Sequence, residues 1–177
     1  MKTIDLYAKN KKVGEAKVDD RDYDHLTQWK WHLHHDGYAI RRIKSHEKTF
    51  TVQMHRQLLG TPHDALADHV NGDRLDNRKS NLRIATHKEN AMNRKVRRTS
   101  RTGIKGVGKY GPRHSWRASI RVDGKTLYLG SYKTARDAAA AYNAAAVKHH
   151  GQYARLNDLE LVDEQEKLLL NSTSNSA

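Results

Sequence analysis

The sequence has no cysteine and only two prolines among its 177 residues. Without cysteine, disulfides and thiolate metal centres are excluded, and a reducing compartment is expected. Apolar residues make up 36% and aromatic residues 7% of the chain, which is little for one large core, so several small modules are expected. There is no long apolar run for a membrane span and no signal-peptide core near the N-terminus. We therefore expect a cytoplasmic protein without membrane association.

Basic residues exceed acidic ones, and they are unevenly distributed along the chain. The formal net charge is +13. Residues 94–125 hold eleven Lys or Arg side chains and one acid, whereas residues 158–167 hold five acids and one Lys. A basic block in mid-chain is typical of nucleic-acid binding. A solvated surface also carries lysines, but this block coincides with a strand pattern, which favours double-stranded DNA as the partner.

The order of apolar patterns and turn residues predicts a multi-domain chain of the α+β class. We expect a β-rich region at 1–53, a ββα unit at 54–94, a basic linker at 95–102, a three-stranded antiparallel sheet packed on one helix at 103–157, and an acidic, then disordered, tail at 158–177.

The run DHVNGDRLDNRKSNLRIATHKEN, which begins at Asp68, is the most informative part of the chain. LADHV and NLRIAT have the character of short strands, and NGDRLDN between them is rich in turn formers. Thr86 and Glu89 have the spacing of a capping box, which starts a helix. The resulting ββα unit is expected to bring Asp68, His69 and Asn90 together.

These residue types fit the hydrolysis of a phosphodiester. Mg²⁺ or Mn²⁺ prefers oxygen ligands, which Asp68 and Asn90 can supply. His69 can take a proton from an attacking water, because an imidazole titrates near neutrality. Asn81, which we place with His69 in the catalytic set, is expected to clamp the loop through its side-chain amide. A simple turn would explain one Asp-His pair, but the joint spacing favours a metal site.

The segments DHVNGDRLDN, SNLRIAT and EN resemble the HNH endonucleases, specifically the H-N-N variant of phage and intron homing enzymes. The resemblance implies that His69 is the general base, that Asp68 and Asn90 bind the metal, and that Asn81 is structural. Because Asn90 stands where a histidine is usual, Mg²⁺ or Mn²⁺ is favoured over zinc. Weaker candidates for buttressing the motif or contacting phosphate are His55, Arg56, Arg83 and His87.

A second pattern lies in WRASIRV, residues 116–122. A strand has a period of two, so its apolar and basic residues face opposite sides. Asp123 and Gly124 suit a type I′ hairpin turn. In the next strand Leu127 and Leu129 are expected to face the core, while Thr126 and Tyr128 join the basic face. Residues 104–109 are expected to form the first strand, and Thr134 to begin an alanine-rich helix.

Residues 103–157 resemble the DNA-binding domain of the plant ethylene-response-factor (Apetala-two) type. The resemblance implies base or phosphate contacts from Lys105, Lys109, Arg117, Ser119, Arg121, Thr126 and Tyr128. In the linker, Arg97 and Arg98 are expected to contact phosphates irrespective of sequence. Gly108 replaces a usual contact, so the plant target sequence cannot be transferred.

Together these patterns favour a site-specific, metal-dependent DNA endonuclease that nicks its substrate. We expect it to be phage-encoded, to act in a bacterial host and to be monomeric. A non-catalytic, sequence-specific DNA-binding regulator is the first alternative. An RNA-directed enzyme is a second alternative, which the groove-reading sheet disfavours.

Overall fold

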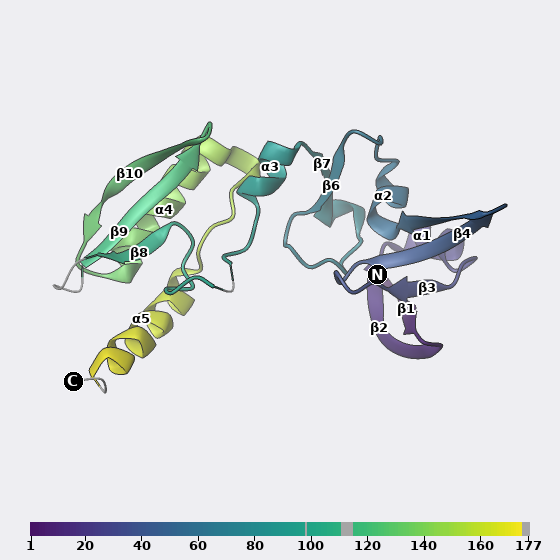
Figure 1. Ribbon diagram of the computed structural model, residues 1–177, viewed down its shortest axis with the longest axis horizontal. Coiled ribbons are helices and arrows are strands. Elements are labelled where there is room, and N and C mark those ends of the chain that lie inside the picture. Colours follow the sequence, from purple (N-terminus) through teal and green to yellow (C-terminus); the bar gives the residue numbers. More distant parts are fainter. Residues whose placement is uncertain (98, 111–114, 175–177) are drawn as a thin grey trace. The chain divides into compact units, whose positions relative to one another are not determined.

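A computed structural model describes residues 1–97, 99–110 and 115–174, with side chains up to residue 169. The chain divides into two compact units, Met1–Ala91 and Met92–Ala177, which Figure 1 shows as the purple-to-teal and green-to-yellow parts. Each unit contains strands and helices, so the predicted α+β class is confirmed. Among the described residues, no helix combines the length and the apolar character needed to cross a membrane.

The larger sheet of the first unit has five strands in the order β2-β1-β3-β4-β5. Its elements are β1 (Lys2–Ala8), β2 (Lys11–Val18), β3 (Trp31–Leu33), β4 (Ala39–Ser45) and β5 (Lys48–Gln53), with helices α1 (Asp20–Leu26) and α2 (Met54–Leu59). β3 pairs with β1 in parallel, and α1 lies in the connection between β2 and β3. Leu6, Leu26, Trp31 and Met54 are fully buried in its core. The Trp31 indole donates a hydrogen bond to the carbonyl of Leu26 at 2.8 Å.

The ββα unit follows α2 and consists of β6 (Leu66–His69), a 3₁₀ turn (Lys79–Asn81), β7 (Leu82–Ala85) and α3 (His87–Met92). The predicted capping box is present. The Thr86 amide donates to Glu89 Oε2 at 2.7 Å, and the Glu89 amide donates to Thr86 Oγ1 at 3.2 Å. These bonds satisfy donors that the first turn of a helix leaves without intrahelical partners.

The loop between β6 and β7 packs against the N-terminal sheet. The Lys17 amide donates to the carbonyl of Leu75, and the Asn77 amide donates to the carbonyl of Lys17, both at 2.8 Å. The Lys79 amide donates to Asp19 Oδ2 at 2.8 Å. The sheet and the ββα elements therefore belong to one compact unit.

The second unit contains the three-stranded antiparallel sheet on one helix that the sequence predicts. Its elements are β8 (Val107–Tyr110), β9 (Ser115–Val122), β10 (Lys125–Tyr132), α4 (Ala135–His150), a 3₁₀ turn (Gly151–Tyr153) and α5 (Leu159–Ser174), with strand order β10-β9-β8. Ala135, Ala138 and Ala139 are fully buried, and their small side chains allow α4 to lie close to β9. Thr134 caps α4 by accepting a hydrogen bond from the Asp137 amide.

The acidic segment that the sequence predicts as a tail instead forms α5. Val162 is buried against the core of the second unit, with Leu159 and Leu169 packed beside it. Glu166 Oε2 accepts a hydrogen bond from the Ala135 amide at 2.9 Å, at the positive end of α4. The apolar residues recur at helical spacing between the acids, which indicates an amphipathic helix. The prediction of a tail relied on the acidic charge and did not use this spacing.

The first strand of this sheet is shorter than predicted, because the chain bends sharply before it. Gly106 has a φ of +73°, a conformation that side chains with a Cβ rarely adopt. A Cβ added there would lie 2.0 Å from Tyr142 Cδ2 and 2.7 Å from the carbonyl oxygen of Ser119. Gly106 therefore allows α4 and β9 to approach this bend closely.

We expect Gly106→Ala to lower the free energy of unfolding of the second unit by about 2–4 kcal/mol, through backbone strain and overpacking. The measurement is urea unfolding followed by NMR signals of residues 115–132. Gly108→Ala is the matched control, because nothing lies within 4 Å of the added Cβ. Similar losses in both variants would contradict this account of Gly106.

Candidate functional site

Asp68 and His69 lie at the end of β6, where both side chains are buried at 8% and 4% relative exposure. The partner strand β7 places Arg83 opposite Asp68 and Leu82 opposite His69. Arg83 Nε and Nη2 donate to Asp68 Oδ2 at 3.0 and 2.7 Å. A positive group therefore lies beside the candidate metal ligand, on the strand that supports it.

The imidazole of His69 is oriented by Asn77, which the sequence analysis did not single out. His69 Nε2 lies 3.4 Å from Asn77 Oδ1, and both side chains are buried. An amide oxygen can only accept, so Nε2 carries the proton in this contact and the lone pair is on Nδ1. Burial lowers the pKa of His69 below its usual value, which favours the neutral ring.

Asn81 bridges the two ends of the loop between β6 and β7. Its Oδ1 accepts from the Asn71 amide at 2.9 Å, and its Nδ2 donates to the carbonyl of Asp76 at 2.8 Å. Its backbone carbonyl accepts from the Val70 amide at 2.9 Å. With three loop contacts, the buried Asn81 acts as a clamp in this structure.

Asn90 lies on α3, within the first compact unit and half-buried. Its amide donates to the Thr86 carbonyl at 2.9 Å, which continues the helix from the capping box. The donor set of a carboxylate and an amide oxygen fits a hard divalent cation such as Mg²⁺ or Mn²⁺. The residues present are therefore chemically suited to such an ion.

The weaker candidates for buttressing the motif or contacting phosphate lie partly in the interior and partly on the surface of the first unit. His55 is buried and its ring lies against His69, with centroids 4.9 Å apart. Arg56 Nη1 and Nη2 donate to the carbonyls of Ala65 and Pro62 at 2.8 and 2.7 Å, so it holds the segment that leads into β6. His87 is exposed at the start of α3.

The second unit carries the predicted basic face. Along β9, Trp116, Ala118 and Ile120 are buried, whereas Arg117 and Arg121 are exposed. Exposed residues Thr126 and Tyr128 lie opposite Arg121 and half-buried Ser119, respectively. The sequence analysis missed Tyr110, which is 60% exposed and has the Arg117 guanidinium 5.7 Å from its ring centroid. The period of two along β8 could have identified it.

Two lysines of the predicted set lie apart from this face. Lys109 is opposite Trp116, on the side that α4 covers, and its Nζ lies 3.3 Å from the carbonyl of Leu169. Lys105 precedes β8 and donates to the carbonyls of Met92 and Arg94. Burial lowers the pKa of Lys105 to about 8.

The predicted phosphate contacts of the linker are Arg97 and Arg98. Arg97 is exposed and lines a cavity of about 460 Å³ together with Ser100, Gly106 and Ser119. Arg98 lies outside the described residues.

Leu127 is the other departure from the predicted faces, because it is 39% exposed although it lies opposite the buried Ile120. Leu129, by contrast, packs against the core as expected.

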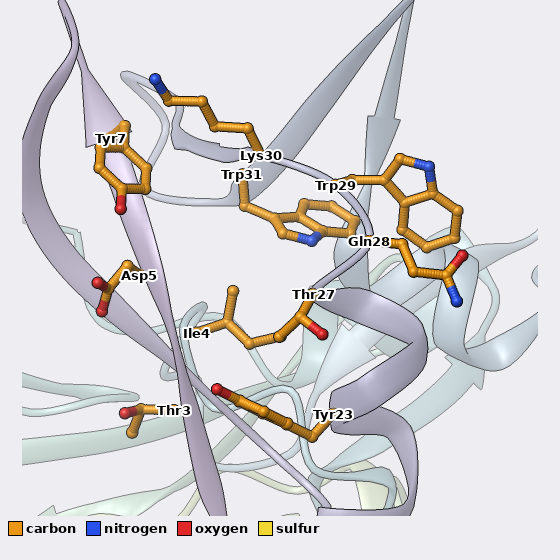
Figure 2. A pocket seen from close by; sticks show the side chains of 10 residues that line it. All are labelled: Thr3, Ile4, Asp5, Tyr7, Tyr23, Thr27, Gln28, Trp29, Lys30 and Trp31. Atoms are coloured by element: carbon orange, nitrogen blue, oxygen red, sulfur yellow. The ribbon is translucent and has the colours of Figure 1, made fainter.

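A further cavity, of about 590 Å³, lies on the N-terminal sheet and is separate from the motif residues (Figure 2). Its lining comes from β1, α1 and the segment up to Trp31, with Tyr7, Tyr23 and Trp29 among its aromatic side chains. Lys30 Nζ lies 4.8 Å from the ring centroid of Tyr7.

Comparison with known proteins points to one family. Residues 61–92, which include the whole motif, match a family model described as HNH endonuclease. The Acanthamoeba polyphaga mimivirus protein named "Uncharacterized HNH endonuclease L560" is 27% identical over 139 residues, 76% of this chain and 70% of that protein. Protein 3.8 of Escherichia phage T7 is 33% identical over 88 residues, 50% of this chain and 72% of that protein. No solved structure matches the chain.

We expect Asn81→Ala to lower the free energy of unfolding of the first unit by about 2–3 kcal/mol, because two side-chain hydrogen bonds are lost and buried partners are left unpaired. The measurement is urea-induced unfolding. Asn90→Ala is the matched control and should change stability by less than about 0.5 kcal/mol. It should instead weaken Mg²⁺ binding in a calorimetric titration. A stable Asn81→Ala protein would show that the clamp is dispensable.

Proposed function

Because this chain belongs to the HNH endonuclease family, we propose that it is a DNA endonuclease with His69 as the general base and with Asp68 and Asn90 as ligands of one divalent ion. The observation that carries the proposal is the orientation of His69. Asn77 lies at Nε2, on the ring edge away from the proposed catalytic nitrogen. Asp68, whose carboxylate is the proposed metal ligand, directly precedes His69 on β6.

In this mechanism His69 Nδ1 takes the proton of the attacking water, while Asn77 Oδ1 keeps the Nε2 proton in place. Arg83, which is paired with Asp68 at 2.7 Å, would also balance charge on the scissile phosphate. Asn81 keeps the loop closed beneath these residues. The ion, when bound, supplies charge neutralisation at the phosphate and at the leaving 3′ oxygen.

We propose that the second unit recognises the DNA sequence that is to be cut. Arg117, Ser119 and Arg121 on β9, with Thr126 and Tyr128 on β10, form a face suited to the major groove, where arginine can bind guanine bidentately. The resemblance to the ethylene-response-factor domain supports this assignment. Arg97, together with Arg98, would contact phosphates. A DNA contact of Lys105 or Lys109 stays a prediction, since each ammonium would first have to leave its carbonyl partners.

One candidate active site per chain favours nicking over double-strand cleavage for a monomer. The phage relative supports the hypothesis that the protein is phage-encoded and acts inside a bacterial host.

We expect purified protein to nick supercoiled DNA carrying its target with Mg²⁺ or Mn²⁺, and His69→Ala to nick about 10²–10⁴-fold more slowly because the general base is lost. Suitable targets come from selection of cleaved sites in a phage genomic library. In EDTA, which prevents cleavage, the His69→Ala variant should bind the target DNA as tightly as the wild type does. His149→Ala, at the exposed end of α4, is the histidine control.

If the wild type binds a selected target but never cuts it with either metal, the alternative of a non-catalytic DNA-binding regulator replaces this proposal.

We expect Arg121→Ala to weaken binding to the target by about 1–3 kcal/mol and binding to random DNA by much less, because a base contact is lost. The measurement is fluorescence anisotropy at two salt concentrations. Lys125→Ala removes the same charge from the same hairpin, at a position that alternates away from the Arg121 face. Equal losses on both DNAs for Arg121→Ala would mean that Arg121 contacts phosphate only.

A further inference from the structure

Three aromatic rings from separate parts of the first unit meet at the candidate general base. The rings of Tyr38 and His55 are stacked, with centroids 4.9 Å apart and an interplanar angle of 29°. His55 lies 4.9 Å from His69 at an angle of 56°, and Tyr38 lies 6.0 Å from His69. Tyr38 precedes β4, His55 is on α2, and His69 ends β6.

The imidazole of His55 is a costly choice for simple packing. The residue is 3% exposed, and its Nδ1 is buried without a hydrogen-bond partner among the residues that the structure describes. Burial also lowers the pKa of His55 to about 3, so the ring is neutral. An aliphatic side chain of similar volume would fill the space without an unsatisfied nitrogen. Apolar packing alone therefore does not account for a histidine here.

Tyr38 also contacts Arg74, a residue of the loop that orients His69. The Arg74 guanidinium lies 4.7 Å from the ring centroid of Tyr38 and donates to the carbonyl of Asp36. Arg74 and Asn77 belong to the same loop between β6 and β7. One loop thus supports His69 directly at Nε2 and indirectly through Tyr38.

A single hydrogen bond does not fix a ring. The contact from His69 Nε2 to Asn77 Oδ1 is long, at 3.4 Å, and rotation about the bond from Cβ to an imidazole has a broad energy profile. The tilted rings of His55 and Tyr38, which lie 4.9 and 6.0 Å from the His69 ring centroid, restrict this rotation. They act at a different place from the Asn77 contact, which holds one edge.

We propose that His55 and Tyr38 are positioning residues for His69, so that the β-rich N-terminal region supplies part of the nuclease site. This inference rests on the proposed function of His69 as the base. It gives a role to residues outside the 61–92 segment that matches the family model. The stack holds the His69 ring in the plane in which Nδ1 meets the attacking water.

We expect His55→Leu to reduce the single-turnover nicking rate about 10–100-fold, because small misplacements of a catalytic group cost rate in this range. The dissociation constant for DNA should stay within about twofold, since His55 is buried and does not reach a bound DNA directly. Unfolding stability should stay equal or rise, because leucine removes the unsatisfied buried nitrogen. A loss of rate without a loss of binding or stability is the signature of positioning.

Three further variants separate positioning from a merely structural role. Tyr38→Phe keeps the ring and should retain the wild-type rate, whereas Tyr38→Leu should behave like His55→Leu. Leu58→Ala lies on the same helix and destabilises the N-terminal core, against which Leu58 packs. If Leu58→Ala, under conditions where it stays folded, lost as much nicking rate as His55→Leu, general loosening of the core would account for the effect and the proposal would be overturned.

An independent reading comes from NMR of the His69 ring, which does not require cleavage. In wild-type protein, nuclear Overhauser effects should connect the His55 and His69 rings, and His55→Leu should shift and broaden the His69 ring signals. Unchanged His69 signals, or a wild-type nicking rate in His55→Leu, would overturn the proposal. A wild type that never cuts would refute the nuclease function and with it the positioning of a base, whereas the ring contact would still be measured.

Discussion

The buried carboxylate of Asp76 holds the loop on which the candidate site depends. Asp76 is 1% exposed, and Arg78 Nε and Nη2 donate to its two oxygens at 2.7 and 2.6 Å. Asn71 Nδ2 adds a hydrogen bond to Oδ2 at 3.0 Å, and Asn81 binds the backbone carbonyl. Arg78 keeps the pKa of Asp76 below its usual value, so the carboxylate stays charged. A buried charge needs partners of this kind, so loss of any of them would destabilise this loop arrangement.

The position of that loop makes the first unit a composite structure. Lys17 on β2 pairs with the loop, and Asp19 accepts from the Lys79 amide. The N-terminal sheet therefore supports the segment that orients His69, and it also presents Tyr38 to the ring cluster. The four candidate residues of the motif are close in sequence, but the loop between them is held by residues as far away in sequence as Asp19, which lies 60 positions before its partner Lys79.

The second unit relies on simpler physics. Alternation along β9 places the arginines on one face and the core on the other. The Arg117 guanidinium lies 4.6 Å from the ring centroid of Tyr128, which restrains a long side chain before any ligand binds. Restraint of this kind lowers the entropic cost of binding. The two units thus differ in construction, as do the roles proposed for them: DNA cleavage for the first unit and DNA recognition for the second.

Much of this architecture could be predicted from the sequence, because it depends on neighbours along the chain. The capping boxes at Thr86 and Thr134 and the alternation of WRASIRV each involve residues a few positions apart. The residue types of the motif likewise predicted a nuclease, and the match to the HNH endonuclease family supports nuclease activity.

Only the tertiary structure placed Asn77 and His55 against His69, paired β3 with β1 in parallel, and docked α5 beside α4. It also turned Lys109 toward the helix side of the sheet through the register of β8 with β9. These features arise from contacts between residues distant in sequence, and a shift of one residue in register reverses which side chains face the core. Local patterns carry no information on which distant partner supplies a contact, so the sequence alone determined the elements and the chemical groups, and the packing determined how those groups meet.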